Sequence, residues 1–294
     1  QTFISVITLI SVAGVMVGVM ALVVVLSVMN GFRADLLSKI LGVNSHLLVM
    51  SYDGAFPGYE ALEREVREAE GVVAASPFIY SQVMVNHGGT VSGAVYRGLD
   101  PETAGDVIGI ETMLEGEGLE ALNRPDRAQP GIILGRQLAR QIGARVGSEV
   151  SVISPQGKLT PMGRTPNNRK YRVVDLFDSG MYEYDATLAY VSLQEAQDFL
   201  GMGDRVTGLE VRVENVDRSD QVASTLEKEL GYPFWTKDWK LMNRSLFAAL
   251  KLEKITMFVI LTMIVLVGAL NIISTLVMVV MEKTRDMAIL RAMG

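Results

Sequence analysis

Two long stretches without a charged residue lie near the two ends of the chain, one over Phe3 to Met29 and one over Ile255 to Met281. A helix of this length is about 40 Å long, at roughly 1.5 Å per residue, whereas the hydrocarbon core of a bilayer is about 30 Å thick. A buried helix of a soluble protein rarely stays uncharged on every face for so long. The pattern therefore predicts two transmembrane helices.

A signal peptide is the alternative interpretation of the first stretch. Its apolar core would be much shorter, and no small-x-small cleavage site with a polar start follows near Met29. Instead the sequence continues as NGFRADLLSKILG, which predicts that the helix runs on past the membrane edge. Two spans put both chain ends on one side of the membrane and residues 30–254 on the other. Lysine and arginine near the spans do not tell which side is cytoplasmic.

Short alternating patterns between the spans predict an α+β domain. Strands are expected at His46–Ser51, Val72–Phe78, Gln82–Asn86, Val91–Gly98, Glu149–Ile153, Tyr171–Phe177, Ala186–Val191, Leu209–Glu214 and 233–235. Helices are expected at Tyr59–Ala69, Ile132–Ile142, Leu193–Leu200 and Arg218–Leu230. The acidic residues 101–123 are expected to be irregular, with a short helix and a loop. The final strand, helix and strand form a βαβ-like return. We interpret the β-rich middle, about 129–203, as an insert into an α+β unit made of flanks at about 44–125 and 206–240.

Two tryptophans precede the second uncharged stretch, in a segment that we expect to lead as a helix into the membrane. Trp235 and Trp239 fit either the aromatic belt of a membrane interface or an ordinary domain core, and the sequence leaves both open.

Composition points away from an enzyme. The chain has no cysteine, and its two histidines, His46 and His87, have no neighbour at metal-ligand spacing. Gly157 and Lys158 lack the glycines of a nucleotide-binding P-loop, and no hydrolase or zinc motif is present. We therefore expect no catalytic, metal or cofactor site in this chain. No nucleic-acid partner is expected.

One basic stretch stands out in a chain of formal net charge -6. Ser154 to Arg172 reads SPQGKLTPMGRTPNNRKYR, with three prolines, five basic residues and no acidic residue. Composition alone makes it a solvated loop between two strands, stiffened by proline.

Small and polar residues inside the spans suggest helix packing. Gly14, Gly18 and Ala21 share one face of the first span and would let another helix approach closely. Asn271 is a single amide in the second span, so we expect it to face protein or a water-filled cavity.

The tail EKTRDMAILRAMG predicts a short amphipathic helix just past the second span. Its apolar residues Met287, Leu290 and Met293 recur every third position, next to Ile289. Such a helix either lies in the membrane interface or docks into a groove of a partner protein, and its pattern does not decide between them.

Three segments resemble the LolC/LolE permeases, the membrane subunits of the bacterial lipoprotein-releasing ABC transporter. They are the opening FISVITLISVAGVMVGVMALVVVLSVMNGFRADLLSKILGVNSHLLV, the segment SPQGKLTPMGRTPNNRKYRVVDLFDSGMYEYD, and the tail EKTRDMAILRAMG. The resemblance covers essentially the whole chain in order. The opening is specific to these permeases, whereas the tail is shared with MacB- and FtsX-type permeases.

The resemblance implies a fragment of a four-span permease of the bacterial inner membrane, with both chain ends in the cytoplasm. Its spans would be 1–29 and 255–281, with a periplasmic domain at 30–254 and a coupling helix at 282–294. The α+β flanks would be a MacB-like porter subdomain and the insert a sabre subdomain. Residues 154–172 would be the hook, a β-hairpin that recruits a soluble LolA-like chaperone.

The resemblance also assigns residues to these parts. The implied hook residues are Pro155, Pro161, Met162, Gly163, Pro166, Arg169, Lys170 and Arg172. The implied coupling residues are Glu282, Arg285, Met287, Ile289, Leu290 and Met293. Gly14, Gly18, Ala21 and Asn271 would pack helices or line a lipid cavity.

The implied function is ATP-driven extraction of triacylated lipoproteins from the outer leaflet of the inner membrane and their transfer to the chaperone. A LolD-like ATPase subunit would hold ATP and Mg, and a second permease copy or paralogue would complete the transporter. The nearest alternative is a MacB-like efflux or mechanotransmission permease. A two-span sensor with a periplasmic ligand domain is a further alternative, and whether the chain is LolC-like or LolE-like stays open.

Overall fold

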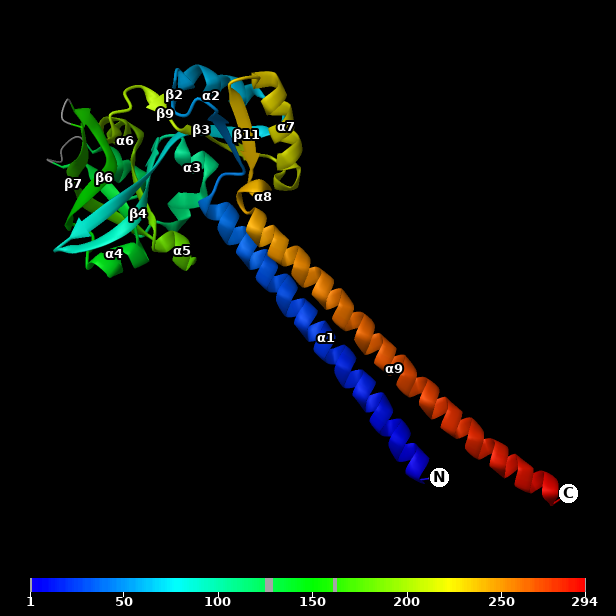
Figure 1. Ribbon diagram of the computed structural model, residues 1–294. Coiled ribbons are helices and arrows are strands. Elements are labelled where there is room, and N and C mark those ends of the chain that lie inside the picture. The colour runs from blue at the N-terminus through cyan, green and yellow to red at the C-terminus, as the bar shows by residue number, and fades with distance from the viewer. Residues whose placement is uncertain (1, 125–128, 161–162, 294) are drawn as a thin grey trace. The chain divides into compact units, whose positions relative to one another are not determined.

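The computed structural model describes residues 2–124, 129–160 and 163–293, with side chains described from Val12 onward except at 156–165, 282, 285 and 286 (Figure 1). The chain forms two compact units. Unit 1 comprises residues 1–36 and 243–294, and unit 2 comprises residues 37–242.

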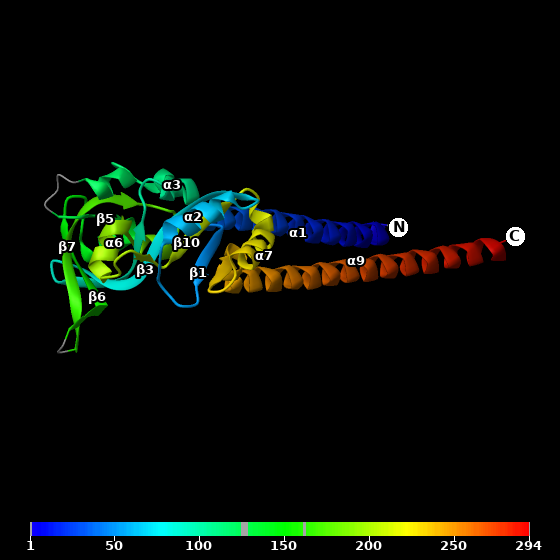
Figure 2. The ribbon, with the colours of Figure 1, turned by 90° about the horizontal axis from the view of Figure 1, so that it is seen from above.

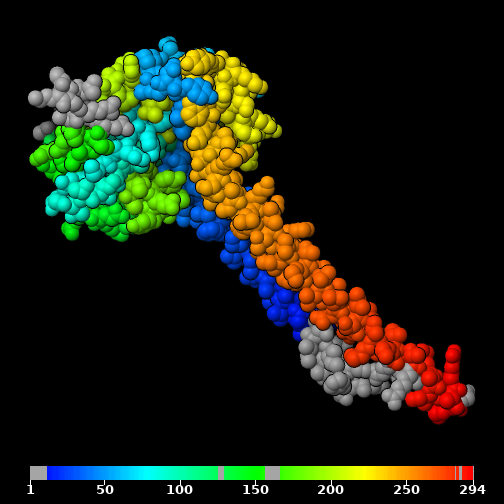
Figure 3. All heavy atoms as spheres, in the orientation of Figure 1, coloured from blue at the N-terminus to red at the C-terminus, as the bar shows by residue number. Residues whose placement is uncertain are grey.

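Unit 1 consists of two long helices, α1 (Thr2–Val43) and α9 (Arg244–Ala292), of 42 and 49 residues. Both are long and apolar enough to cross a membrane. Their apolar side chains are exposed along the helices, which is what a lipid-facing surface requires. Figure 3 shows the atoms of α9 at the surface along the helix. The helix predicted to continue past Met29 is confirmed, because α1 ends only at Val43.

The tail after the second span does not form a separate helix. α9 runs unbroken from Arg244 to Ala292, because no glycine or proline interrupts the sequence after Gly268. The approach to the span also differs from the expected single helix. It consists of strand β11 (Phe234–Asp238), the short helix α8 (Trp239–Met242) and then α9.

The tryptophans of this approach belong to unit 2. Trp235 lies in β11 opposite Met50, and Trp239 is buried, with its indole Nε1 donating a hydrogen bond to the Val216 carbonyl at 3.0 Å. For Trp239 the core interpretation is therefore the correct one.

Unit 2 contains a nine-stranded sheet in the order β11-β1-β10-β3-β4-β8-β5-β7-β6. The four strands at the β11 end of this sheet, together with two helices, make a βαββαβ arrangement. In chain order its elements are β1 (Leu47–Ser51), α2 (Tyr59–Glu68), β3 (Val72–His87), β10 (Gly208–Val213), α7 (Ser219–Leu230) and β11. Strands β10 and β11 both run antiparallel to β1, so α7 connects two parallel strands. The predicted βαβ return is confirmed.

The other strands close into a barrel together with the far half of β3. They are β4 (Thr90–Leu99), β8 (Leu188–Ser192), β5 (Gly131–Gly135), β7 (Gly163–Phe177) and β6 (Glu149–Thr160). The barrel closes because β6 also pairs with β3, with Met84 opposite Ile153. Its interior holds Tyr96, Tyr171 and the helix residue Phe199, whose ring centroids lie 5.4 to 6.3 Å apart. Phe199 belongs to helix α6 (Leu193–Leu200).

Two strands of this barrel lie outside the insert expected at about 129–203. β3 and β4 precede residue 129, and β3 serves both parts of unit 2: its first half pairs with β10 and its second half with β6. The β-rich middle is therefore not an independent unit, because two strands of the flank complete its barrel.

The helix predicted at Ile132–Ile142 is wrong in its first part. Gly131–Gly135 is the strand β5, and only Arg136–Ile142 is helical, as α4. β5 is buried on both faces between β7 and β8, so its sequence GIILG does not alternate and cannot be told from a buried helix by its pattern. The residue between the two elements is Gly135, and a larger residue would not fit there because its Cβ would collide with the Asp185 carbonyl oxygen.

The remaining elements are short. They are α3 (Ala104–Val107), η1 (Gly109–Met113), η2 (Leu119–Asn123), α5 (Tyr182–Asp185), η3 (Val216–Arg218) and a two-stranded pair of β2 (Phe56–Pro57) with β9 (Arg205–Val206). The segment 101–123, where a short helix and a loop were expected, contains the short helix α3 and the 3-10 helices η1 and η2.

Candidate functional site

The basic stretch 154–172 is part of a two-stranded ribbon rather than a loop. β6 and β7 pair from Glu149 opposite Arg172 out to Thr160 opposite Gly163, and Figure 2 shows the two strands running out together beyond the barrel. We call residues 154–172 the hook. Pro161 and Met162 lie outside the described residues.

The prolines of the hook lie at a break in the strand pairing. The register shifts between Ser154 and Lys158, so that residues 155–157 stand opposite Pro166. Proline has no N–H to donate to a ladder, so Pro155 and Pro166 are tolerated at such an irregular point and not within regular pairing. Both prolines are exposed. The break separates a paired base next to the barrel from a paired outer part.

The returning strand of the hook is tied to helix α6. Tyr171 faces the barrel interior, and Arg169 and Asn167 share that face because successive side chains of a strand alternate. The Arg169 guanidinium pairs with the Glu195 carboxylate at 2.6 Å, and the Tyr171 hydroxyl donates to the same oxygen at 2.8 Å. Asn167 Nδ2 donates a hydrogen bond to the Phe199 carbonyl.

The tyrosine pair beneath this contact stays protonated. Burial raises the pKa of Tyr171 and of Tyr96 well above the usual value, and their hydroxyls lie 2.9 Å apart. A neutral Tyr171 can donate to Glu195, so the hydroxyl chain and the ion pair act on the same carboxylate.

The other two basic residues at the hook base lie on the outer face. Lys170 Nζ contacts Glu149 Oε1 at 2.6 Å, and the Gln129 amide donates to the second oxygen at 2.5 Å. These two hydrogen bonds hold the pKa of Glu149 below its usual value, and the one from Lys170 has the larger effect. Arg172 donates to the Gly147 carbonyl at 3.4 Å. Arg169, Lys170 and Arg172 therefore each have a partner within unit 2.

Glu195 was not found by sequence reasoning. It lies 26 residues from Arg169 along the chain, and only the closure of the barrel brings α6 against β7. A glutamate in the first turn of a helix, three residues after the N-cap Ser192, is an ordinary capping position and gave no other signal.

Removing the Glu195 carboxylate is expected to loosen the hook. In Glu195→Ala, Arg169 and Tyr171 both lose their acceptor. We expect the free energy of unfolding to fall by only about 1 kcal/mol, because solvent screens a partly exposed ion pair. Thermal unfolding and protease cleavage at the hook would measure it, with faster cleavage expected. Glu149→Gln removes an exposed ion pair at the same base and should change neither. A double-mutant cycle with Arg169→Ala that shows strict additivity would contradict the contact.

The tail residues carry their side chains outward from α9. Met287, Ile289, Leu290 and Met293 are all exposed, with Met293 at 81%. The backbone of Glu282 and Arg285 is helical, and their side chains lie outside the described residues. The assignment of a docking role to these six residues stays a prediction.

Two of the small residues predicted for packing lie on one groove of unit 1. A Cβ at Gly18 would stand 3.5 Å from Ile264 of α9, so α1 and α9 approach closely there. Gly14 has open space instead and lines a groove of about 410 Å³ together with Gly18 and Asn271. Ala21 is exposed and does not line this groove.

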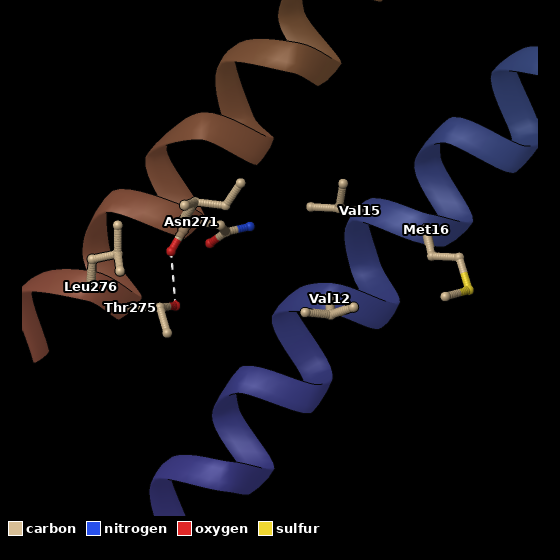
Figure 4. Close-up of a pocket in the computed structure, with 7 residues that line it drawn as sticks. Val12, Val15, Met16, Asn271, Thr275 and Leu276 are labelled. Carbon is tan, nitrogen blue, oxygen red and sulfur yellow. Dashed lines mark hydrogen bonds between the residues drawn. The ribbon is translucent and has the colours of Figure 1, made fainter. Parts of the chain in front are cut away.

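Asn271 also lines a second groove, of about 430 Å³, with Val12, Val15 and Thr275 (Figure 4). Its side chain extends from α9 toward α1, while the Asn271 carbonyl accepts a hydrogen bond from Thr275 at 2.9 Å. The amide thus faces an apolar groove between the two helices, and its role stays a prediction.

The histidines face backbone atoms. His46 Nδ1 lies 3.2 Å from the Val213 carbonyl, and burial lowers the pKa of His46. His87 Nδ1 lies 2.8 Å from the Glu149 carbonyl. In the part of the chain that the structure describes, no group of three His, Cys, Asp or Glu residues is placed to hold a metal ion.

Comparison with known proteins settles the family. The MacB-like periplasmic core domain family matches residues 8–229. The lipoprotein-releasing system transmembrane protein LolC of Neisseria meningitidis serogroup B is 37% identical, over 99% of this chain and 70% of that protein. The chain belongs to the LolC/LolE family.

Other members of the LolC/LolE family match with the same extent. LolC of Xylella fastidiosa is 32% identical over 99% of this chain and 70% of its own length. LolE of Haemophilus influenzae is 23% identical over 97% of this chain and 68% of its own length. Because these matches run from the first span to the tail, they argue against a two-span sensor.

Proposed function

We propose that this chain is a permease subunit of an ATP-driven transporter that releases lipoproteins from the outer leaflet of the bacterial inner membrane. The observation that carries this proposal is 37% identity to a lipoprotein-releasing LolC along 99% of the chain, spans and tail included. The subunit itself is non-catalytic, and a separate LolD-like ATPase binds ATP and Mg.

In the proposed topology the two charge-free helices put both chain ends on one side of the membrane, and the similarity to LolC assigns that side to the cytoplasm. Unit 2 lies in the periplasm, and the N-terminus and the end of α9 lie in the cytoplasm. The chain covers 70% of the length of its LolC relatives. In the proposed four-span permease, the other two spans would correspond to the part of these relatives that the match does not cover. A second permease, a copy or a paralogue, completes the transporter.

The hook is the proposed docking site for a soluble LolA-like chaperone. Three features support this role: the ribbon extends beyond the barrel, Pro155 and Pro166 are exposed, and Arg169 ties the returning strand to α6. A preorganised ribbon loses less conformational entropy on docking than a free loop. Because Arg169 and Lys170 are paired within unit 2, shape and backbone contribute more to docking here than free positive charge.

The apolar grooves of unit 1 suit the passenger that this function requires. Moving a triacyl anchor out of the membrane costs about 0.8 kcal/mol of free energy for each methylene that becomes exposed to water. Three chains together would require tens of kcal/mol unless they stay in apolar surroundings, so both ATP and a chaperone are needed. Val12, Val15 and Met16 give α1 a wall of this character.

The end of α1 offers a mechanical link between membrane and periplasm. Ile40 and Val43 are buried in the core of unit 2, and Asn44 Nδ2 donates to the Tyr184 hydroxyl at 2.7 Å. Helix α1 approaches η1 so closely that a Cβ at Gly109 would lie 3.1 Å from the Gly42 carbonyl oxygen. A displacement of the last turns of α1 must therefore move η1 with them.

A leucine at Gly109 is expected to break this link. In Gly109→Leu the side chain would push η1 away from Gly42, and we expect lipoprotein release to fall several-fold while ATP hydrolysis by the complex continues. Release and hydrolysis would be measured on the same proteoliposomes. Gly93→Leu is the matched control, because a Cβ at Gly93 meets nothing within 4 Å. Equal release by both variants would contradict the link.

The function itself is tested by reconstitution. The full-length protein with its ATPase and partner permease is placed in proteoliposomes that contain a triacylated lipoprotein, and release to added chaperone is followed with and without ATP. ATP-dependent transfer of the lipoprotein supports the proposal. Export of small molecules without lipoprotein release would instead identify a MacB-like efflux permease.

A further inference from the structure

A third groove of unit 1 lies where both charge-free stretches end. It encloses about 350 Å³ between α1 and α9. Its apolar part includes Leu26 and Phe258, and its polar part consists of Asn30, Arg33, Glu253 and Lys254. The first charged residue after the charge-free stretch of α1 is Arg33, and the last before that of α9 is Lys254. The groove therefore crosses the edge of the hydrocarbon region.

Helical spacing puts these residues in line along the groove. Leu26, Asn30 and Arg33 stand at i, i+4 and i+7 on α1, which is one face of a helix. Arg33 is about 10 Å further along the axis than Leu26, at roughly 1.5 Å per residue. A bilayer passes from acyl chain to headgroup over a similar depth, because its interfacial layers are about 5–8 Å thick on each side.

The charges of the groove are not used by neighbouring side chains. Within the part of the chain that the structure describes, neither Arg33, Glu253 nor Lys254 has an ion-pair or hydrogen-bond partner at its side chain. Two cations and one carboxylate that share a groove with apolar walls match the charges of an amphiphile with a phosphate and an ammonium group. Paired guanidinium and ammonium donors are the usual protein ligands of phosphate.

We propose that this groove binds a glycerophospholipid of the membrane by its phosphate, held between Arg33 and Lys254, with the acyl chains along Leu26 and Phe258. Glu253 faces the same space and favours a headgroup that carries an ammonium, so phosphatidylethanolamine is preferred to phosphatidylglycerol. The site is distinct from the passage of a lipoprotein anchor, because a thioether-linked diacylglyceryl cysteine has no phosphate. The proposal needs only that α1 and α9 span a membrane, and it does not depend on the transported substrate.

The test is native mass spectrometry of the full-length protein in complex with its ATPase, with lipid added in detergent. The probes are phosphatidylethanolamine, phosphatidylglycerol, diacylglycerol and a synthetic triacylated lipopeptide. In the double variant Arg33→Gln, Lys254→Gln we expect binding of both phospholipids to fall about tenfold, the factor expected when charged hydrogen-bond donors are lost. Binding of diacylglycerol and of the lipopeptide should not change.

Single substitutions sharpen the assignment. Glu253→Gln should lower binding of phosphatidylethanolamine and leave that of phosphatidylglycerol unchanged. Lys251→Gln, on the same helix but outside the groove lining, is the matched control and should bind like the parent. Arg33→Lys, Lys254→Arg keeps both charges and should restore phospholipid binding, which separates loss of a ligand from loss of fold.

Two results would overturn the proposal. Unchanged phospholipid binding in the double glutamine variant would mean that the two cations only mark the membrane edge or contact further helices. An equal loss of lipopeptide and phospholipid would mean that the groove belongs to the cargo path. Neither result would bear on lipoprotein release itself, which the reconstitution assay measures separately.

Discussion

Shortening the hook is expected to abolish crosslinking to the chaperone and to cut lipoprotein release at least about tenfold, a loss that corresponds to about 1.4 kcal/mol or more of docking energy. The change replaces residues 155–166 by Asn-Gly, which then links Ser154 to Asn167. Ser154 and Asn167 already face each other in the ribbon, and a two-residue turn of this type closes antiparallel strands without splaying them.

The shortened variant should keep its fold for a structural reason. The paired base from Glu149 to Ser154 is retained, and so are the contacts of Asn167 and Arg169 with α6. ATP hydrolysis by the complex should therefore continue. The three quantities to measure are crosslinking to a chaperone that itself carries the photoreactive residue, release to chaperone, and hydrolysis.

A second exposed hairpin provides the control. β3 and β4 are joined through a turn at Gly88 and Gly89, and Asn-Gly in place of those glycines changes a turn of the same barrel without touching the hook. This control should crosslink and release like the parent. Normal release by the shortened hook would refute its role in docking.

The membrane helices could be predicted from the sequence because the bilayer imposes a rule that local composition must satisfy. A charge in hydrocarbon is costly, so a membrane helix excludes charge along its whole span, and few soluble helices remain uncharged for 27 residues in a row. Glycine stop signals were equally local: helix α4 ends at Gly143 and α6 at Gly201, both in the left-handed region.

The barrel could not be predicted, because its closure depends on contacts between distant segments. Met84 and Ile153 are 69 positions apart, and nothing in either strand specifies the other. The prediction of the buried strand β5 failed for a related reason, because a strand that is covered on both faces lacks the alternation of apolar and polar residues that identifies strands. Strands predicted next to each other, such as 72–78 and 82–86, proved to be one element, β3, whose two halves serve different partners.

The hook illustrates what composition can and cannot provide. Three prolines and five basic residues indicated a stiff, solvated, positive segment. In the structure the segment is a paired ribbon, and Arg169 and Lys170 form ion pairs with carboxylates from α6 and β6. No local sequence pattern predicts these ion pairs. Charge read from a single segment therefore overstates the free charge that a partner would meet.

Breaking the buried ion pair of unit 2 is expected to cost about 3–5 kcal/mol, the usual penalty for leaving one buried charge without its partner. Arg97 of β4 pairs with Glu210 of β10 across the intervening strand β3, with both side chains buried. Burial alone would lower the pKa of Arg97, and the Glu210 carboxylate outweighs this and holds the pKa above its usual value. The pair thus joins the βαββαβ part to the barrel by charge.

The Tyr190 ring completes the surroundings of the guanidinium. Its centroid lies 5.5 Å from Arg97 Cζ, and burial raises the pKa of Tyr190 to about 12, so the hydroxyl stays neutral. A second anion is therefore not at hand in Glu210→Ala, and the neutral Tyr190 side chain cannot replace the lost carboxylate. The guanidinium would then either stay buried without a counter-charge or be hydrated by water that enters between the βαββαβ part and the barrel.

Thermal unfolding of the solubilised full-length protein measures this cost. For a unit of this size a loss of about 3–5 kcal/mol corresponds to a fall in Tm of about 10 °C. Arg97→Met with Glu210→Leu removes both charges and should recover most of the loss, because apolar residues of similar volume can replace a buried ion pair. Asp220→Ala breaks the more exposed pair with Lys240 and should leave Tm unchanged. If Glu210→Ala also unfolds at the parental temperature, water must already reach the pair, and it cannot be what holds the two parts of unit 2 together.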